Sequence, residues 1–157
     1  MLDQEYDSME RKFEKAKFEL EQQQERTRVW NERENTARAN KIACYFEDAL
    51  VDVLLRATTS DQATFSLGVS ESVLNPLDEC GPLRYSKDVQ DRVQEKLKSS
   101  EKEFREICSK QRFTLVGFEV SFSKRPIDIP GTGDAWEPGF TYHDMVTKIL
   151  IKLSKTE

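Results

Sequence analysis

The chain has 157 residues, with 24 Lys and Arg against 29 Asp and Glu, so its formal net charge at neutral pH is -5. This acidic balance argues against nucleic acid or an anionic membrane as the main partner, although a local basic patch is compatible with it. The opening MLDQEYDSME lacks the features of a secretory signal, and the apolar runs elsewhere are too short to cross a bilayer. We therefore expect a soluble, intracellular protein, cytoplasmic or nuclear.

The chain has three cysteines, Cys44, Cys80 and Cys108, and none belongs to a CxxC pair. An odd number at wide spacing predicts reduced thiols rather than a disulfide framework or a zinc site. We expect neither a metal nor a cofactor.

The N-terminal third of the chain is predicted to form one long helix. No proline or glycine occurs from Leu2 to Ala57, and helix-favouring residues dominate this stretch. Such a helix would be about 84 Å long at a rise of roughly 1.5 Å per residue, which is too long to fold back on a small domain. Its apolar stripe must therefore be buried against another helix.

Residues along the start of this helix recur in alternating steps of four and three, which is the spacing of a coiled-coil seam. The seam residues are Leu2, Tyr6, Met9, Phe13, Ala16, Leu20, Thr27 and Trp30, with Gln23, Glu34 and Ala37 at the remaining positions. The seam is apolar as far as Leu20 and degenerate after it. A second copy of the chain is the favoured partner, because two-fold pairing is the commonest oligomeric arrangement. A different partner chain is the alternative, and the pairing direction stays open.

From Ala39 onward the helix carries a wider apolar face, which is typical of a helix that enters a globular core. The face consists of Ala39, Ile42, Ala43, Phe46, Ala49, Leu50, Val53 and Leu54. Residues Thr58 to Asp61 favour caps and turns, so the helix should end there. We therefore predict a coiled-coil oligomerisation helix over residues 1–38 and an interaction domain over residues 39–157.

Three shorter elements follow the long helix. Alternating apolar residues in TFSLGVS predict a strand over 64–70, and the proline-containing stretch 74–82 predicts a loop. Ser86 suits a helix N-cap, and the helix should run to about Gln111. A strand then places Val116, Phe118, Val120 and Phe122 on one face.

The last element is predicted over residues 145–153, as a strand or alternatively a short helix. As a strand it places Met145, Thr147, Ile149, Ile151 and Leu153 on one face, with Lys148 and Lys152 on the other. The element order predicts an α+β fold: a long N-terminal coiled-coil helix, then a small domain whose few-stranded, mainly antiparallel sheet is covered on one face by helices.

The segment RTRVWNERENTARANK, residues 26–41, is a candidate nucleic-acid contact. Its cations are Arg26, Arg28, Arg33, Arg38 and Lys41, against the anions Glu32 and Glu34. Around Asn35 and Arg38 it resembles the basic region of leucine-zipper DNA-binding proteins, which would imply a helix in a DNA groove. The apolar heptads of this chain precede the basic segment, however, whereas in that family they follow it. A solvated, mixed-charge helix face is the favoured interpretation.

Residues Lys124 to Phe140 are predicted to form a long loop, with Trp136 and Phe140 as candidate anchors for a partner protein. The alternative is that both side chains fold back over the sheet edge. PGTGD within the loop lacks the Lys and Ser or Thr of a phosphate loop. His143 beside Asp144 has no nucleophile or metal-ligand spacing around it, so we expect no catalytic residues and no enzyme.

These features predict a non-enzymatic protein-interaction or scaffold subunit, dimeric through its N-terminal helix, whose α+β domain is presented to another protein. The architecture is similar to that of several kinetochore and scaffold subunits, a likeness that fixes no function. A nucleic-acid-binding protein that uses the segment 26–41 is the alternative, and an enzyme centred on His143 is a third possibility.

Overall fold

The computed structural model describes residues 8–75, 85–131, 133 and 138–156. The chain divides into two units, Met1–Thr36 and Ala37–Glu157, and helix α2, Ser8–Thr59, contributes residues to both. Within α2, the hydroxyls of Thr27 and Thr36 donate hydrogen bonds to the carbonyls of Gln23 and Glu32, one turn earlier in the helix. The long helix is confirmed, and it ends where the turn-favouring residues begin.

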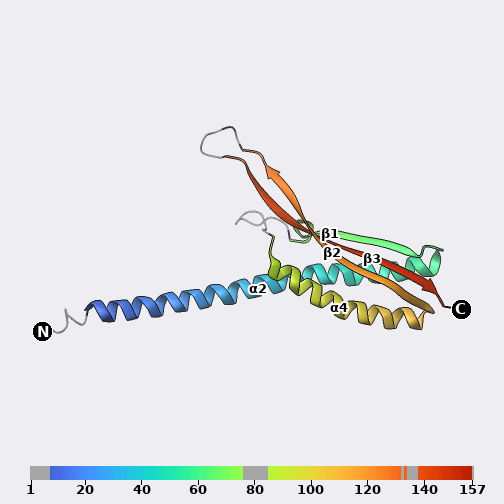
Figure 1. Ribbon diagram of the computed structural model, residues 1–157, viewed down its shortest axis with the longest axis horizontal. Helices are drawn as coiled ribbons and strands as arrows, with labels where there is room; N and C mark the ends of the chain where they lie inside the picture. The colour runs from blue at the N-terminus through green and yellow to red at the C-terminus, as the bar shows by residue number, and fades with distance from the viewer. Residues whose placement is uncertain (1–7, 76–84, 132, 134–137, 157) are drawn as a thin grey trace. The chain divides into compact units, whose positions relative to one another are not determined.

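The second unit is built around one three-stranded antiparallel sheet. After α2 come β1 (Thr64–Ser70), the short helix α3 (Glu71–Leu74), α4 (Lys87–Lys110), β2 (Phe113–Ile129) and β3 (Phe140–Lys155). The strand order is β1-β3-β2, and both pairings are antiparallel (Figure 1). The predicted α+β fold with an antiparallel sheet is confirmed. Helix α3 was not predicted.

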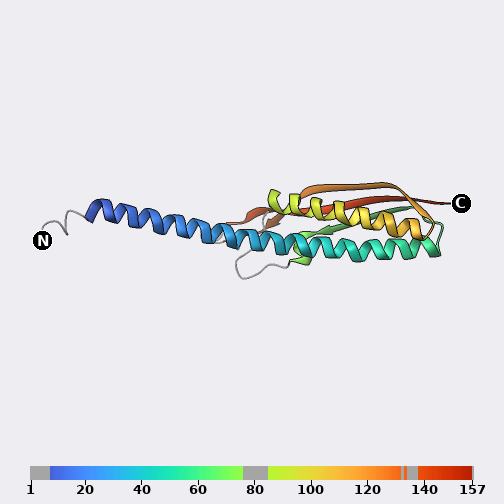
Figure 2. The same cartoon turned by 90° about the horizontal axis from the view of Figure 1, so that it is seen from below.

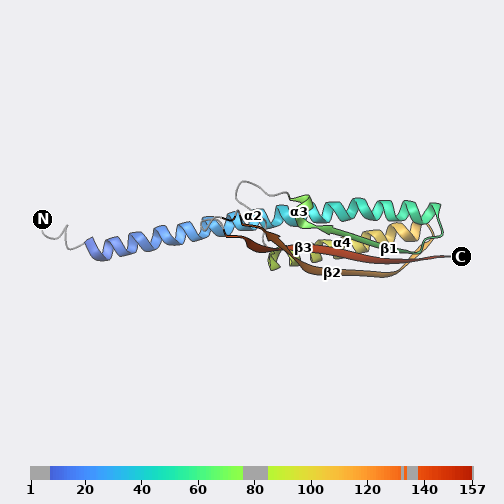
Figure 3. The same ribbon diagram turned by 90° about the horizontal axis from the view of Figure 1, so that it is seen from above.

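One face of the sheet is covered by two helices. The part of α2 from residue 37 onward and α4 lie side by side along this face (Figures 2 and 3). Phe46 of α2, Leu97 of α4 and Ile149 of β3 are fully buried in the shared core. Burying side chains of this size contributes roughly 1.5 to 3 kcal/mol each, which makes this core the main source of the domain's stability.

Helix α4 begins and ends as its sequence indicates. Ser86 is the N-cap, and its hydroxyl accepts a hydrogen bond from the Val89 amide at 3.3 Å. At the other end Arg112 adopts a φ of 63°, the left-handed conformation that commonly stops a helix. The predicted helix from Ser86 to about Gln111 is therefore confirmed.

Strand β2 contains a β-bulge that the alternation of residues did not reveal. Leu115 pairs with Leu153 and Gly117 with Lys152, so Val116 is the extra residue. The buried face of β2 includes Leu115 before the bulge and Phe118 after it, while Val116 is 64% exposed. The prediction that Val116 shares a face with Phe118 is wrong, because a bulge adds one residue to the alternation.

The β2–β3 hairpin continues beyond the three-stranded part of the sheet. The last pair between β1 and β3 is Ser70 with Val146, whereas β2 and β3 stay paired as far as Ile129 and Phe140. The predicted loop from Lys124 to Phe140 is therefore wrong in its bounds. Its first six residues belong to β2 and its last residue to β3. Strand pairing satisfies the backbone hydrogen bonds of a segment whose composition had suggested a loop.

Candidate interaction surfaces

The seam residues within residues 8–36 lie on an exposed helix. Met9, Phe13, Leu20 and Trp30 are each more than half exposed, and Ala16 and Thr27 are exposed as well. None of the residues described between 8 and 36 is buried. Leu2 and Tyr6 lie outside the described residues. Large apolar side chains left in water at regular spacing are typical of an interaction surface.

Phe18 is a further exposed aromatic residue that the seam does not include. It is 61% exposed, and it follows Phe13 by five residues, which places it about 140° around the helix from Phe13. The seam and Phe18 therefore lie on different faces of the helix. Phe18 is evident in the sequence as a large apolar residue, but it does not fall on a position of the four-and-three seam spacing.

The cations of the segment 26–41 differ in their surroundings. Arg28 forms ion pairs with Glu25 at 2.6 Å and Glu32 at 3.2 Å, and its hydrogen bonds lower the pKa of Glu25. Arg38 is largely buried and pairs with Glu71. The remaining cations, Arg26, Arg33 and Lys41, are exposed. Two of the five cations are thus already paired with carboxylates, and a phosphate would have to compete with these.

A buried charged network links Arg38 of α2 to the start of α3 and to β3. Glu71, at 2% exposure, pairs with Arg38, while its Oε2 atom has no hydrogen-bond partner among the described residues. Asp144, also at 2% exposure, accepts hydrogen bonds from the Ser72 hydroxyl at 2.5 Å and the Ser72 amide at 3.2 Å. The partly exposed Arg125 lies 3.5 Å from the same carboxylate. The negative charges of the two acids balance the positive charges of the two arginines. The network is therefore better suited to holding α2, α3 and β3 together than to binding a cation.

Burial raises the pKa of Glu71, and the opposing effect of Arg38 is smaller. The nearby Asp144 carboxylate raises the pKa of Glu71 further. The sequence does not reveal this network, because its members are far apart in the chain and have no shared spacing. The one visible signal was Asp144 beside His143.

His143 and Asp144 do not form a joint site. They are neighbours in β3, where successive side chains point to opposite faces, and His143 is exposed while Asp144 is buried.

Of the two candidate partner-binding residues, the structure describes only one. Phe140 is 50% exposed at the first position of β3, where it pairs with Ile129, and Trp136 lies outside the described residues.

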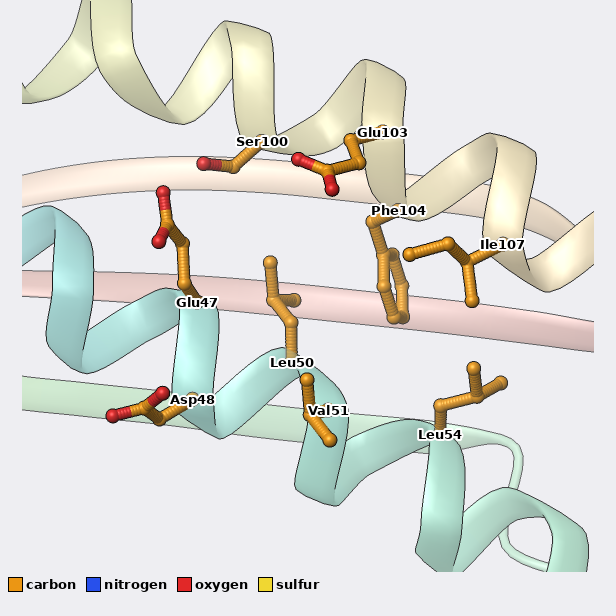
Figure 4. Close-up of a pocket in the computed structure, with 9 residues that line it drawn as sticks. All are labelled: Glu47, Asp48, Leu50, Val51, Leu54, Ser100, Glu103, Phe104 and Ile107. Atoms are coloured by element: carbon orange, nitrogen blue, oxygen red, sulfur yellow. The ribbon is translucent and has the colours of Figure 1, made fainter.

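An apolar groove lies between α2 and α4 in the second unit (Figure 4). Its volume is about 350 Å³. Leu50, Val51 and Leu54 of α2 face Phe104 and Ile107 of α4 across it. Val51 is 60% exposed and Ile107 is 38% exposed, so the apolar lining is open to solvent. Leu50 and Leu54 were predicted to belong to the core-facing side of the helix, and no groove was predicted.

The groove is acidic at one end. Glu47 points toward α4 there near Ser100, and the Glu103 carboxylate lies across from Leu50, while Leu54 and Ile107 lie toward the other end (Figure 4). Asp48 projects from the side of α2 that is turned away from α4. None of these three carboxylates has an ion-pair partner within the described part of the chain. The acids of neighbouring turns differ in this respect, since Asp52 pairs with Arg56 and Glu101 with Arg105.

Metal binding and thiol reactivity have little support among the described residues. No cluster of three or more His, Cys, Asp or Glu suited to a metal occurs among the residues described. Cys44 and Cys108 are free, and Cys80 lies outside the described ranges. Burial raises the pKa of Cys108 to about 11, which keeps this thiol protonated at neutral pH.

None of the helices described here combines the length and the apolar character that crossing a membrane requires. Comparisons with protein-family models, with curated proteins and with solved structures found no match.

Proposed function

We propose that this protein is a non-enzymatic interaction or scaffold subunit that dimerises through the N-terminal part of α2 and presents its α+β domain to another protein. The observation that carries this proposal is the exposure of Met9, Phe13, Leu20 and Trp30. Four large apolar side chains at coiled-coil spacing favour burial against a second helix. The free Cys44 and Cys108 fit a reducing compartment, cytoplasm or nucleus.

The energetics favour helix pairing over an isolated helix. Burial of these side chains would contribute roughly 1.5 to 3 kcal/mol each before ordering costs. Local pairs such as Arg28 with Glu25 are exposed to solvent and contribute much less. Two joined copies would carry two α+β domains, so a repeated or dimeric target would be bound with avidity.

The nucleic-acid alternative has less support. Arg28 and Arg38 are occupied by carboxylates, and the net charge of the chain is negative. An enzyme centred on His143 is also less supported, because His143 is exposed and its neighbour Asp144 is bound to Ser72.

The experiment is a light-scattering measurement of solution mass for the full chain and for Phe13→Ser/Leu20→Ser. The wild-type chain should give about twice the monomer mass of 18.3 kDa at low and high salt, and the variant should give the monomer mass. Lys12→Ser/Glu21→Ser is the matched control. It places serine beside the same positions but off the seam, and it should remain dimeric.

A wild-type monomer at both salt concentrations would contradict dimerisation. So would a Phe13→Ser/Leu20→Ser variant that stays assembled. An assembly that forms only at low salt would point to charge pairing rather than apolar burial.

A further inference from the structure

The groove between α2 and α4 has the chemistry of a helix-binding site. Apolar side chains from two neighbouring helices line it, and Val51 and Ile107 remain substantially exposed. Grooves of this type bind one apolar face of an amphipathic helix, whose anchors recur at three- and four-residue steps. This feature goes beyond dimerisation, since the groove lies wholly within the second unit.

The charge of the groove selects among possible occupants. Glu47 and Glu103 face the space between α2 and α4 without ion-pair partners in the described residues, and Asp48 adds a third acid on the outer side of α2. These carboxylates would repel an acidic segment, whereas Lys or Arg side chains would neutralise them. Two grooves facing each other across a two-fold axis would bring the acids of both copies together, which disfavours self-pairing through this surface.

We propose that the groove binds a basic amphipathic helix of a partner protein, with cationic side chains over Glu47 and Glu103 and within reach of Asp48. The apolar anchors of that helix would contact Val51, Leu54 and Ile107 at the other end of the groove. This inference rests on the proposed interaction function and names the chemistry of the partner.

The test uses two synthetic helical peptides with the same leucine face, one flanked by lysines and the other by glutamates. Fluorescence anisotropy measures the binding of each labelled peptide to the full chain. The wild type should prefer the lysine peptide by at least about tenfold. Glu47→Lys/Asp48→Lys/Glu103→Lys should reverse that preference.

Two further variants separate groove binding from general attraction. Asp61→Lys/Glu95→Lys/Glu119→Lys changes the net charge equally at exposed acids outside the groove lining, and it should keep the wild-type preference. Val51→Ser/Ile107→Ser should weaken binding of the lysine peptide about tenfold, because each substitution removes apolar contact. Circular dichroism checks that every variant is folded.

Equal loss of preference in both charge variants would overturn the proposal, because binding would then follow net charge alone. Unchanged binding in Val51→Ser/Ile107→Ser would also overturn it. If that variant instead changes the solution mass without affecting peptide binding, the groove is a contact between copies of this chain. Failure of the dimerisation test leaves this result intact, since the groove variants change residues of the second unit alone.

Discussion

The two parts of helix α2 have the same secondary structure and opposite environments. Between residues 8 and 36 no described side chain is buried, although Met9, Phe13 and Leu20 are large and apolar. From residue 37 to the end of the helix, seven residues are buried, and Phe46 and Ile42 are fully enclosed. The same backbone geometry is thus compatible with a solvated helix and with a core helix.

This difference shows where helix stability comes from. Propensity and local ion pairs are enough to specify the helical pattern of the first part. Packing against α4 and the sheet stabilises the second part, and tertiary packing is usually the larger contribution. In the proposed function, the exposed apolar residues of the first part are the ones that a partner helix would bury.

The largest expected effect comes from the buried part of the helix. Phe46→Ala should lower the free energy of unfolding by about 3 to 5 kcal/mol, because it leaves a cavity in the core. Val51→Ala is the matched control on the same helix, and its exposed position should make the loss less than about 0.5 kcal/mol. Urea denaturation followed by circular dichroism measures both. Similar losses would mean that Phe46 is not packed as described.

A somewhat smaller effect is expected from the charged network. Arg38→Met should cost about 3 kcal/mol, because the buried Glu71 carboxylate loses its partner. Arg28→Met removes exposed ion pairs from the first part of the helix, and its effect on the free energy of unfolding should be much smaller than that of Arg38→Met. Equal effects in urea denaturation would show that Arg38 is as solvated as Arg28.

The smallest effect is a change in pH dependence. Because burial raises the pKa of folded Glu71 above its ordinary value of 4.5, the folded state holds this proton more tightly than the unfolded state. The resulting stability is complete below the unfolded pKa and is lost as pH rises through the folded pKa. Relative to Glu71→Gln, the wild type should therefore lose stability as pH rises from about 4 to about 7.

Denaturation midpoints of the wild type and Glu71→Gln across this range provide the measurement. Glu25→Gln serves as the control, since the pKa of Glu25 is lowered and the side chain is exposed. It should not reproduce the wild-type slope. A slope of the opposite sign would mean that Arg38 outweighs the burial of Glu71.

Much of the fold followed from local patterns. The exposed helix, the cap at Ser86 and the alternation of Met145, Thr147 and Ile149 were all readable, because each depends on residues close in sequence. The bulge at Val116 and the extension of β2 to Ile129 were not. Both depend on the register with β3, which residue periodicity within one strand does not encode.

The interaction surfaces divide in the same way. The shared face of Phe13 and Leu20 follows from their seven-residue spacing, because helical periodicity alone puts them on one side of the helix. Only the tertiary structure brought Arg38, Glu71 and Asp144 together and set Val51 of α2 opposite Ile107 of α4. Those contacts join segments distant in the chain, and their geometry is fixed by the packing of helices on a sheet rather than by local preference.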